Sequence, residues 1–153
     1  MGARETIEPG FRRIYAGIQH NVELIPDDRL DVKPEGLETR SFREIALHIA
    51  DSCVIFGDNI GKTTWERIAA FPPDAYRTKA QVVDAVRQGG ERYLAGLARL
   101  TDAEAERVCE APWGAKHPQG MLVGFQVPHL FYHNGQLAIY LRMAGIKPLF
   151  APR

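Results

Sequence analysis

The residues best suited to carry chemistry are two histidines, His129 and His133, which lie four positions apart. On a helix this spacing places both imidazole rings on one side, one turn above the other. Ring nitrogens from adjacent turns can both approach a zinc-sized ion to about 2.0–2.1 Å, and a third ligand must then come from another helix. The pair alone is equally compatible with hydrogen-bonded core packing. Because Leu130 stands where the HExxH motif has glutamate, hydrolysis by that protease mechanism is not indicated.

His48 is the candidate for the third ligand. Ser41 and Glu44 have the spacing of a capping box, which predicts that a helix begins here. Ile45 and Ile49 then belong to an apolar stripe at helical spacing, and His48 lies three residues after Ile45. We therefore expect the His48 imidazole to point toward the core, where it can meet the other two rings.

Three more polar residues follow the candidate ligands by about one helical turn. They are Asp51 and Ser52 after His48, and Gln136 after His133. From these positions each side chain could line the pocket or orient a ligand nitrogen. Gln136 is the strongest candidate, whereas Asp51 is equally compatible with a solvated carboxylate, since burying an unpaired charge is costly.

Helices must position these residues, and four segments carry apolar residues at helical spacing: residues 11–25, 41–60, 78–100 and about 121–144. Pro128 lies inside the last segment, so a kink or a late helix start is predicted near it. Gly89 and Gly90 indicate a close approach between helices, because no phosphate-loop pattern surrounds them. No alternating pattern is long enough to predict a sheet. Residues 1–153 are thus predicted to form a single all-α domain.

Composition narrows the classes of function. The chain has 153 residues, of which 45% are hydrophobic, and its 19 basic residues balance its 19 acidic ones. A net charge of zero supplies no positive field for nucleic acid, so no nucleic-acid partner is expected. The two cysteines lack the spacing of a disulfide framework or a metal site, which favours a cytoplasmic protein. The sequence shows no signal-like stretch and no apolar run of membrane length, so we expect a protein that does not enter the membrane.

The segment from His129 to Pro148 resembles the final helix of the DinB-like (DinB/YfiT) family, which has two histidines four apart, then Arg-Gly-Gln and a Tyr-Leu-Arg ending before Gly and Pro. The matching residues after the second histidine are Gly135, Gln136, Tyr140, Leu141, Arg142, Gly145 and Pro148. The segment 41–50 is similarly like the family's helix that supplies the first histidine. Asn134 departs from the family pattern, which has arginine there, and this puts any role of that charge in doubt.

This resemblance implies a four-helix bundle with long crossover connections and an unusual helix order. It further implies one divalent metal ion on His48, His129 and His133, with zinc or nickel favoured over iron or manganese, and a homodimer. A set of three histidines leaves a coordination position open, as in catalytic sites. A bound ion could lower the pKa of water from about 15.7 toward 7 for a hydrolysis, or could ionise a small thiol for a transferase reaction.

Two other interpretations remain. In one, the protein is a non-catalytic, stress-associated dimeric binding or scaffold protein in which the metal only joins the second and last helices. In the other, the histidines are core packing and bind no metal. The favoured hypothesis is a metal-dependent enzyme, either a hydrolase or a thiol-dependent transferase, that acts on a small molecule.

Overall fold

Four long helices make up most of the computed structural model, which describes residues 2–149. They are α1 (Ala3–Leu24), α2 (Phe42–Asp58), α3 (Lys79–Leu97) and α5 (Gln119–Met143). One cluster of buried apolar side chains, with members from all four helices, fills the space between them. The predicted all-α bundle is confirmed, while Met1 and residues 150–153, the ends of the predicted domain, lie outside the described residues.

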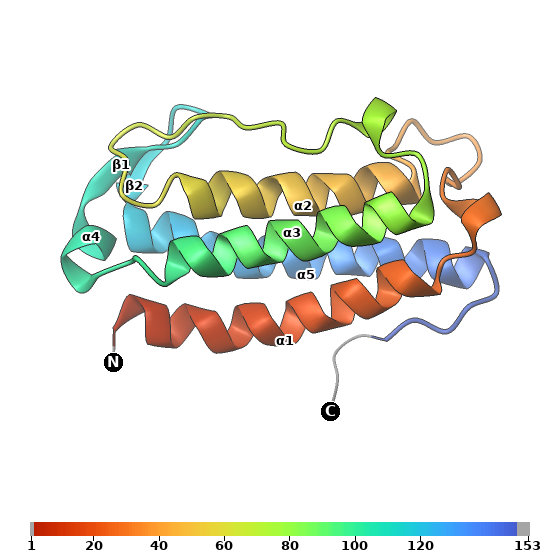
Figure 1. Cartoon of the computed structure of the whole chain (residues 1–153), viewed down its shortest axis with the longest axis horizontal. Helices are drawn as coiled ribbons and strands as arrows, with labels where there is room; N and C mark the ends of the chain where they lie inside the picture. The colour runs from red at the N-terminus through yellow and green to blue at the C-terminus, as the bar shows by residue number, and fades with distance from the viewer. Residues whose placement is uncertain (1, 150–153) are drawn as a thin grey trace.

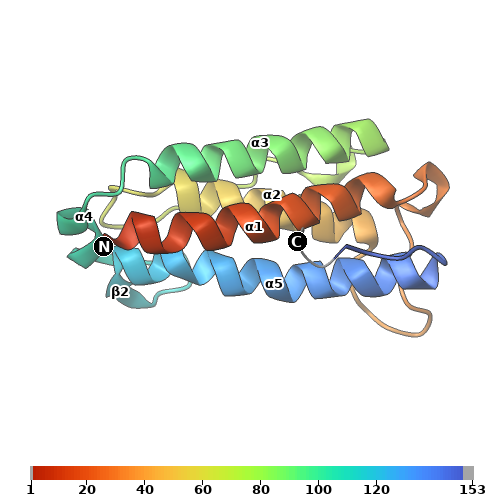
Figure 2. The same cartoon turned by 90° about the horizontal axis from the view of Figure 1, so that it is seen from below.

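The order of the helices in space differs from their order along the chain. Helices α1 and α2 each pack against both α3 and α5, so α1 and α2 lie diagonally across the bundle. The colours in Figures 1 and 2 show that α1 and α5 run in one direction and that α2 and α3 run in the other. Because α2 and α3 are parallel neighbours, the chain must return along the whole bundle between them (Figure 1). This is one of the long crossover connections that the family resemblance implied.

The start of α2 is fixed by the predicted capping box. The Glu44 backbone N–H donates to Ser41 Oγ at 3.3 Å, and the Ser41 backbone N–H donates to Glu44 Oε2 at 2.7 Å. Each bond satisfies an N–H that has no partner inside the helix. The same device begins α3, where Thr78 and Gln81 pair reciprocally. Because the capping box fixes the residue at which α2 begins, it also helps to fix the rotation of α2 about its axis. That rotation determines that His48 points inward.

The crossover connection lies against α2, and two side chains of α2 and its C-cap hold it there. Asp51 Oδ1 accepts from the backbone N–H groups of Ala70 and Phe71, at 2.8 and 2.9 Å. At the end of α2, the Asn59 side chain both donates to and accepts from the Glu66 backbone at 2.9 Å. The connection is therefore an ordered wall beside α2, which matters for the cavity described below.

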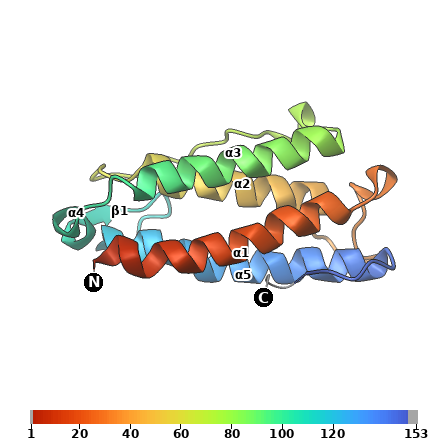
Figure 3. The ribbon, with the colours of Figure 1, turned by 60° about the horizontal axis from the view of Figure 1, so that its bottom comes forward.

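A short helix and a small sheet close one end of the bundle (Figure 3, beside the start of α1). Helix α4 (Asp102–Glu106) precedes β1 (Val108–Glu110) and β2 (Lys116–Pro118), which pair antiparallel with Cys109 opposite His117. The expectation of four helices without a sheet was wrong here. Strands of three residues are too short to show the alternation by which strands are recognised.

Helix α5 continues through Pro128 and begins at Gln119, slightly before the predicted start. Of the two outcomes predicted near Pro128, a kink or a late helix start, the late start is wrong, because the proline lies within the helix. Helix α1 likewise begins at Ala3, well before its apolar stripe, and contains Pro9. Although α5 has 25 residues, neither it nor any other described helix has the length and apolar character needed to cross a bilayer.

Helices α2 and α3 touch through their backbones, as the glycines predicted. A Cβ atom placed on Gly89 would lie 2.7 Å from the carbonyl oxygen of Ala50 and 2.8 Å from its Cα. Gly57 of α2 approaches α3 in the same way, since its Cβ would lie 2.6 Å from the Arg92 carbonyl oxygen. These contacts fix the position of α2 against α3 and leave its opposite face for α5.

We expect Gly89→Ala to lower the free energy of unfolding by about 1–3 kcal/mol, because the methyl group must displace rigid backbone. Gly135→Ala in α5 is the matched control, since nothing lies within 4 Å of its added Cβ. The control should be neutral or stabilise by about 0.5–1 kcal/mol through its helix propensity. Urea unfolding of both variants measures the difference, and equal stabilities would contradict the close packing.

Candidate metal site

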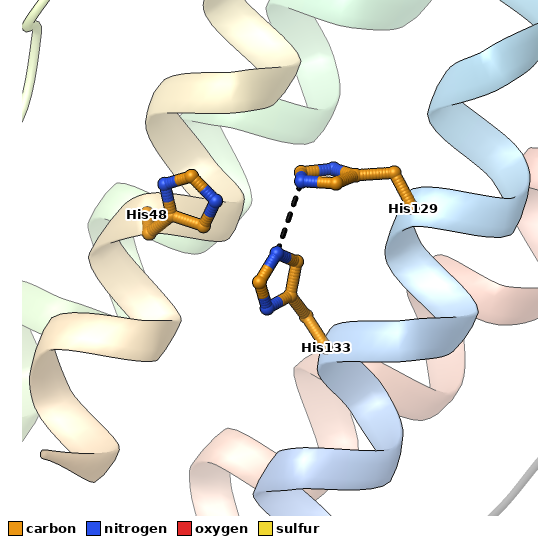
Figure 4. A group of neighbouring side chains, drawn as sticks. All are labelled: His48, His129 and His133. Atoms are coloured by element: carbon orange, nitrogen blue, oxygen red, sulfur yellow. Dashed lines mark hydrogen bonds between the residues drawn. The ribbon is translucent and has the colours of Figure 1, made fainter. Parts of the chain in front are cut away.

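Three imidazoles meet between α2 and α5 (Figure 4). His48 comes from α2, and His129 and His133 come from adjacent turns of α5. One nitrogen from each ring can be chosen so that all three lie within 4.8 Å of one another. The ring centroids are 4.4 Å apart for His129 and His133, and 4.6 and 5.4 Å from His48 to His133 and His129. The structure thus brings together the three residues that the sequence singled out as ligands.

The side chain of Gln136 determines which nitrogen of His133 is available. Its Oε1 lies 2.7 Å from His133 Nδ1 and can only accept, so Nδ1 carries the proton in the neutral ring. His133 Nε2 then presents a lone pair, and it faces His129 Nε2 at 3.0 Å. Metal-binding histidines are usually held in this way, with the second ring nitrogen donating to an oxygen. Gln136 therefore occupies the orienting position that the sequence suggested for it.

The protons on His129 cannot satisfy the site by themselves. If His129 Nε2 donates to His133, the buried Nδ1 of His129 is left as an acceptor, and no described group bonds to it. If Nδ1 carries the proton, two lone pairs face each other at 3.0 Å. A cation between the Nε2 atoms removes this conflict. Metal–nitrogen distances of about 2.0–2.1 Å imply nitrogens about 3.3 Å apart in a tetrahedral site, so the three rings fit a metal after small rotations.

Burial and neighbouring positive charge keep the imidazoles neutral. Burial is the main reason why the pKa of His48 falls from 6.5 to about 3, and the charges of His133, Arg40 and His129 lower it further. Burial, then His133 and Arg40, lowers the pKa of His129 to about 4. The pKa of His133 is also lowered, mainly by burial, although its bond to Gln136 opposes the shift. Neutral imidazole is the form that binds metals.

Ser52 and Asp51 have different surroundings. Ser52 lines a cavity together with His48 and His129, and its Oγ donates to the Ile49 carbonyl at 2.8 Å. Asp51 turns to the crossover connection instead, where its carboxylate accepts from two backbone N–H groups. Among the described residues its carboxylate bonds to no histidine, so its role here is to hold the wall of the site.

Sequence reasoning missed three residues near the site. Gln126 is fully buried, donates to Ser52 Oγ at 2.9 Å, and lies three residues before His129, so helical spacing could have identified it. Arg40 precedes the capping box of α2 and acts on the rings through its charge. Arg67 lies in the crossover connection and lines the cavity with His48. Nothing in the sequence around Arg67 indicates that the connection returns to the site.

The fold and the site together define a helical bundle with a three-histidine centre between two of its helices. The chain belongs to the DinB family, whose sequence model matches residues 15–151. The search of curated proteins finds no match to the sequence.

Several solved structures share the fold. The DinB-like protein YjoA from Bacillus subtilis has 23% identity and a TM-score of 0.77, with 97% of this chain and 99% of that chain covered. YfiT from Bacillus subtilis, described as a probable metal-dependent hydrolase with an unusual four-helix bundle topology, has 19% identity and a TM-score of 0.71, with 94% and 89% covered. A mutant of a mycothiol-dependent maleylpyruvate isomerase has 10% identity and a TM-score of 0.69 over 88% of this chain and 60% of that one.

The depressed pKa values predict how the stability of the metal-free protein depends on pH. A histidine with a lower pKa in the folded state binds fewer protons there than in the unfolded chain, so acid favours unfolding. The stability that neutral His48 and His129 contribute is present above about pH 6.5. It is lost as the pH falls toward their folded values of about 3 and about 4.

We therefore expect the melting temperature of metal-free protein to fall between pH 7 and pH 4.5, and His48→Gln to reduce that fall. Differential scanning calorimetry after chelator treatment measures both curves. If the melting temperature fell equally with pH in the parent and in the variant, His48 would not contribute to the acid sensitivity as its lowered pKa requires.

Proposed function

We propose that the chain is a metal-dependent enzyme that holds one divalent ion on His48, His129 and His133 and acts on a small molecule. The observation that carries this proposal is the convergence of three neutral imidazoles, with nitrogens within 4.8 Å, beside a cavity. Imidazole ligands suit several late first-row ions. Zinc or nickel is the favoured ion, with iron and manganese as further candidates.

The geometry supports catalysis because three ligands leave a fourth position for a small molecule. When bound, a divalent ion supplies a Lewis acid that polarises a substrate oxygen or lowers the pKa of a water or thiol. The chain itself supplies the orientation of the rings. Gln136 holds the proton on His133 Nδ1 and keeps Nε2 free. The cavity lets a small molecule approach the side of the site formed by His48 and His129.

Two reaction classes are supported by the relatives. The description of YfiT as a probable metal-dependent hydrolase supports hydrolysis. The likeness to a mycothiol-dependent isomerase supports dependence on a thiol, which a thiol-dependent transferase would share. Hydrolysis is our first proposal, because the YfiT alignment covers most of both chains.

The test of the metal site is a comparison of two histidine variants. His48→Ala should reduce bound zinc from about one equivalent to nearly none, because removing a ligand costs more than the 10–100-fold loss typical of orienting partners. His20→Ala is the matched control, since His20 is exposed on α1. Elemental analysis of protein prepared without a histidine tag measures both. Equal zinc content in the two variants would overturn the site.

The rival function is a scaffold in which the ion only joins α2 to α5. The absorption spectrum of the cobalt-substituted protein distinguishes the enzyme from the scaffold. An open coordination position predicts spectral changes on addition of azide or a small thiol. An enzyme should further hydrolyse esters or amides, or transfer a thiol, in a way that disappears in His48→Ala. Unchanged cobalt spectra with every added ligand would favour the scaffold.

We also propose that two copies associate through the outer face of α5. This face carries a stripe of exposed apolar residues at helical spacing, opposite the buried Leu130 and Leu137; its members are Met121, Tyr132, Ile139 and Met143, which are 49–65% exposed. An exposed apolar patch of this extent marks an interaction surface. A second copy is the simplest partner, because an interface around a two-fold axis pairs one patch with itself.

Ile139→Asp should therefore shift the protein from dimer to monomer, because it places a charge within the paired stripe. Leu37→Asp is the control, since Leu37 is 61% exposed but lies in the connection between α1 and α2. Sedimentation equilibrium measures the association constant of each. A parent protein that is monomeric at high concentration would contradict the proposed interface.

A further inference from the structure

The cavity beside the histidines has an unusual combination of lining residues. Its volume is about 290 Å³, near the lower end of small-molecule sites, which are roughly 300–1,000 Å³. It is bounded by α2, α5, the crossover connection and the turn between the two strands. Its apolar residues are Ile55, Phe56, Pro112, Trp113 and Phe125, and its polar residues are His48, Ser52, Arg67 and His129.

Two aromatic side chains of the cavity are unusually accessible. Trp113 is 51% exposed and Phe125 is 56% exposed, although each is large and apolar. The Trp113 ring lies 6.2 Å from the ring of Phe56, tilted by 43°, so the two form a partly covered aromatic surface. Such surfaces around a concave site bury the apolar body of a ligand. A single ring with a short chain matches the volume better than a peptide or polymer does.

Arg67 gives the cavity a charge. It is exposed, and among the described residues no hydrogen bond or ion pair involves its side chain. Other arginines of the protein, such as Arg43 and Arg92, pair with aspartates. No carboxylate lines this cavity, so the Arg67 guanidinium has no counter-charge within it. A planar guanidinium of this kind favours a carboxylate, which it can bind with two parallel hydrogen bonds.

We propose that the cavity binds a small arylalkanoate, with its carboxylate on Arg67 at the rim and its ring against Trp113 and Phe125. Arg67 is exposed whereas His48 and His129 are half-buried, so the carboxylate lies at the outer end and the far end of the ligand points toward the histidines. This proposal rests on the proposed function only in treating the histidines at the inner end of the cavity as a metal site. Binding of the ring and the carboxylate does not require the metal.

Fluorescence of Trp113 provides the test. The chain has two tryptophans, and Trp65 is only 3% exposed, so a ligand in the cavity should act mainly on the emission of Trp113. We expect 3-phenylpropanoate to give a saturable change. Its amide and amine analogues should bind at least about tenfold more weakly, because they lack the charge that pairs with Arg67. Propanoate, which lacks the ring, should give no saturable change over the same range.

Variants of the arginine separate a direct contact from a general charge effect. Arg67→Gln should weaken 3-phenylpropanoate binding at least about tenfold, and Arg67→Lys should retain part of it. Arg13→Gln is the control, because Arg13 is exposed on α1 and lines none of the cavities described here; its affinity should stay within about twofold of the parent. Circular dichroism checks that each variant is folded. The proposal would be overturned if 3-phenylpropanoate and its amine analogue bound equally well, or if Arg67→Gln left the affinity for 3-phenylpropanoate unchanged.

The same titrations with and without zinc keep the two proposals separate. One equivalent of zinc bound through His48, with no binding of 3-phenylpropanoate, would overturn the cavity proposal and leave the metal site intact. If 3-phenylpropanoate bound in an Arg67-dependent way but the protein took up no zinc, the cavity proposal would stand and the metal site would be overturned.

Discussion

The site depends on the approach of α2 to α5 at the level of His48. Each element that positions α2 therefore acts on the site. The capping box at Ser41 sets where the helix begins, and Gly89 of α3 brings backbone against backbone on its far side. Asp51 attaches the crossover connection to the same helix. These contacts fix the helix backbone that carries His48, and a fixed backbone is one requirement of a preorganised ligand.

Burial of the three rings has a chemical consequence as well as a structural one. Histidines at their ordinary pKa would be partly protonated below neutral pH and would repel a cation. Here burial, followed by mutual charge, lowers the pKa of His48 and His129 to about 3 and about 4. The protein thus loses some stability in acid, but it keeps three neutral imidazoles whose lone pairs can bind a metal. The Nε2 atoms of His129 and His133, which face each other at 3.0 Å, are a further sign that the metal-free arrangement is incomplete.

Much of the site could be predicted because its ligands lie on helices. The spacing of His129 and His133 and the stripe around His48 specify direction from sequence alone, since the helical period is fixed. The family resemblance then joined two segments that spacing could not join. Residues in irregular chain were beyond this reasoning: Arg67 and Trp113 reach the cavity only through long-range packing. The bond from Asp51 to the crossover connection was missed for the same reason. The strands were missed because three residues are too few to show alternation.

X-ray absorption spectroscopy of the zinc-loaded protein tests the central claim most directly, because it reports the atoms around the ion. The account predicts three imidazole nitrogens at about 2.0–2.1 Å and one non-protein ligand, such as water, that exchanges with added anions or thiols. Fewer than three imidazoles, or a fourth protein ligand that closes the coordination sphere, would contradict it.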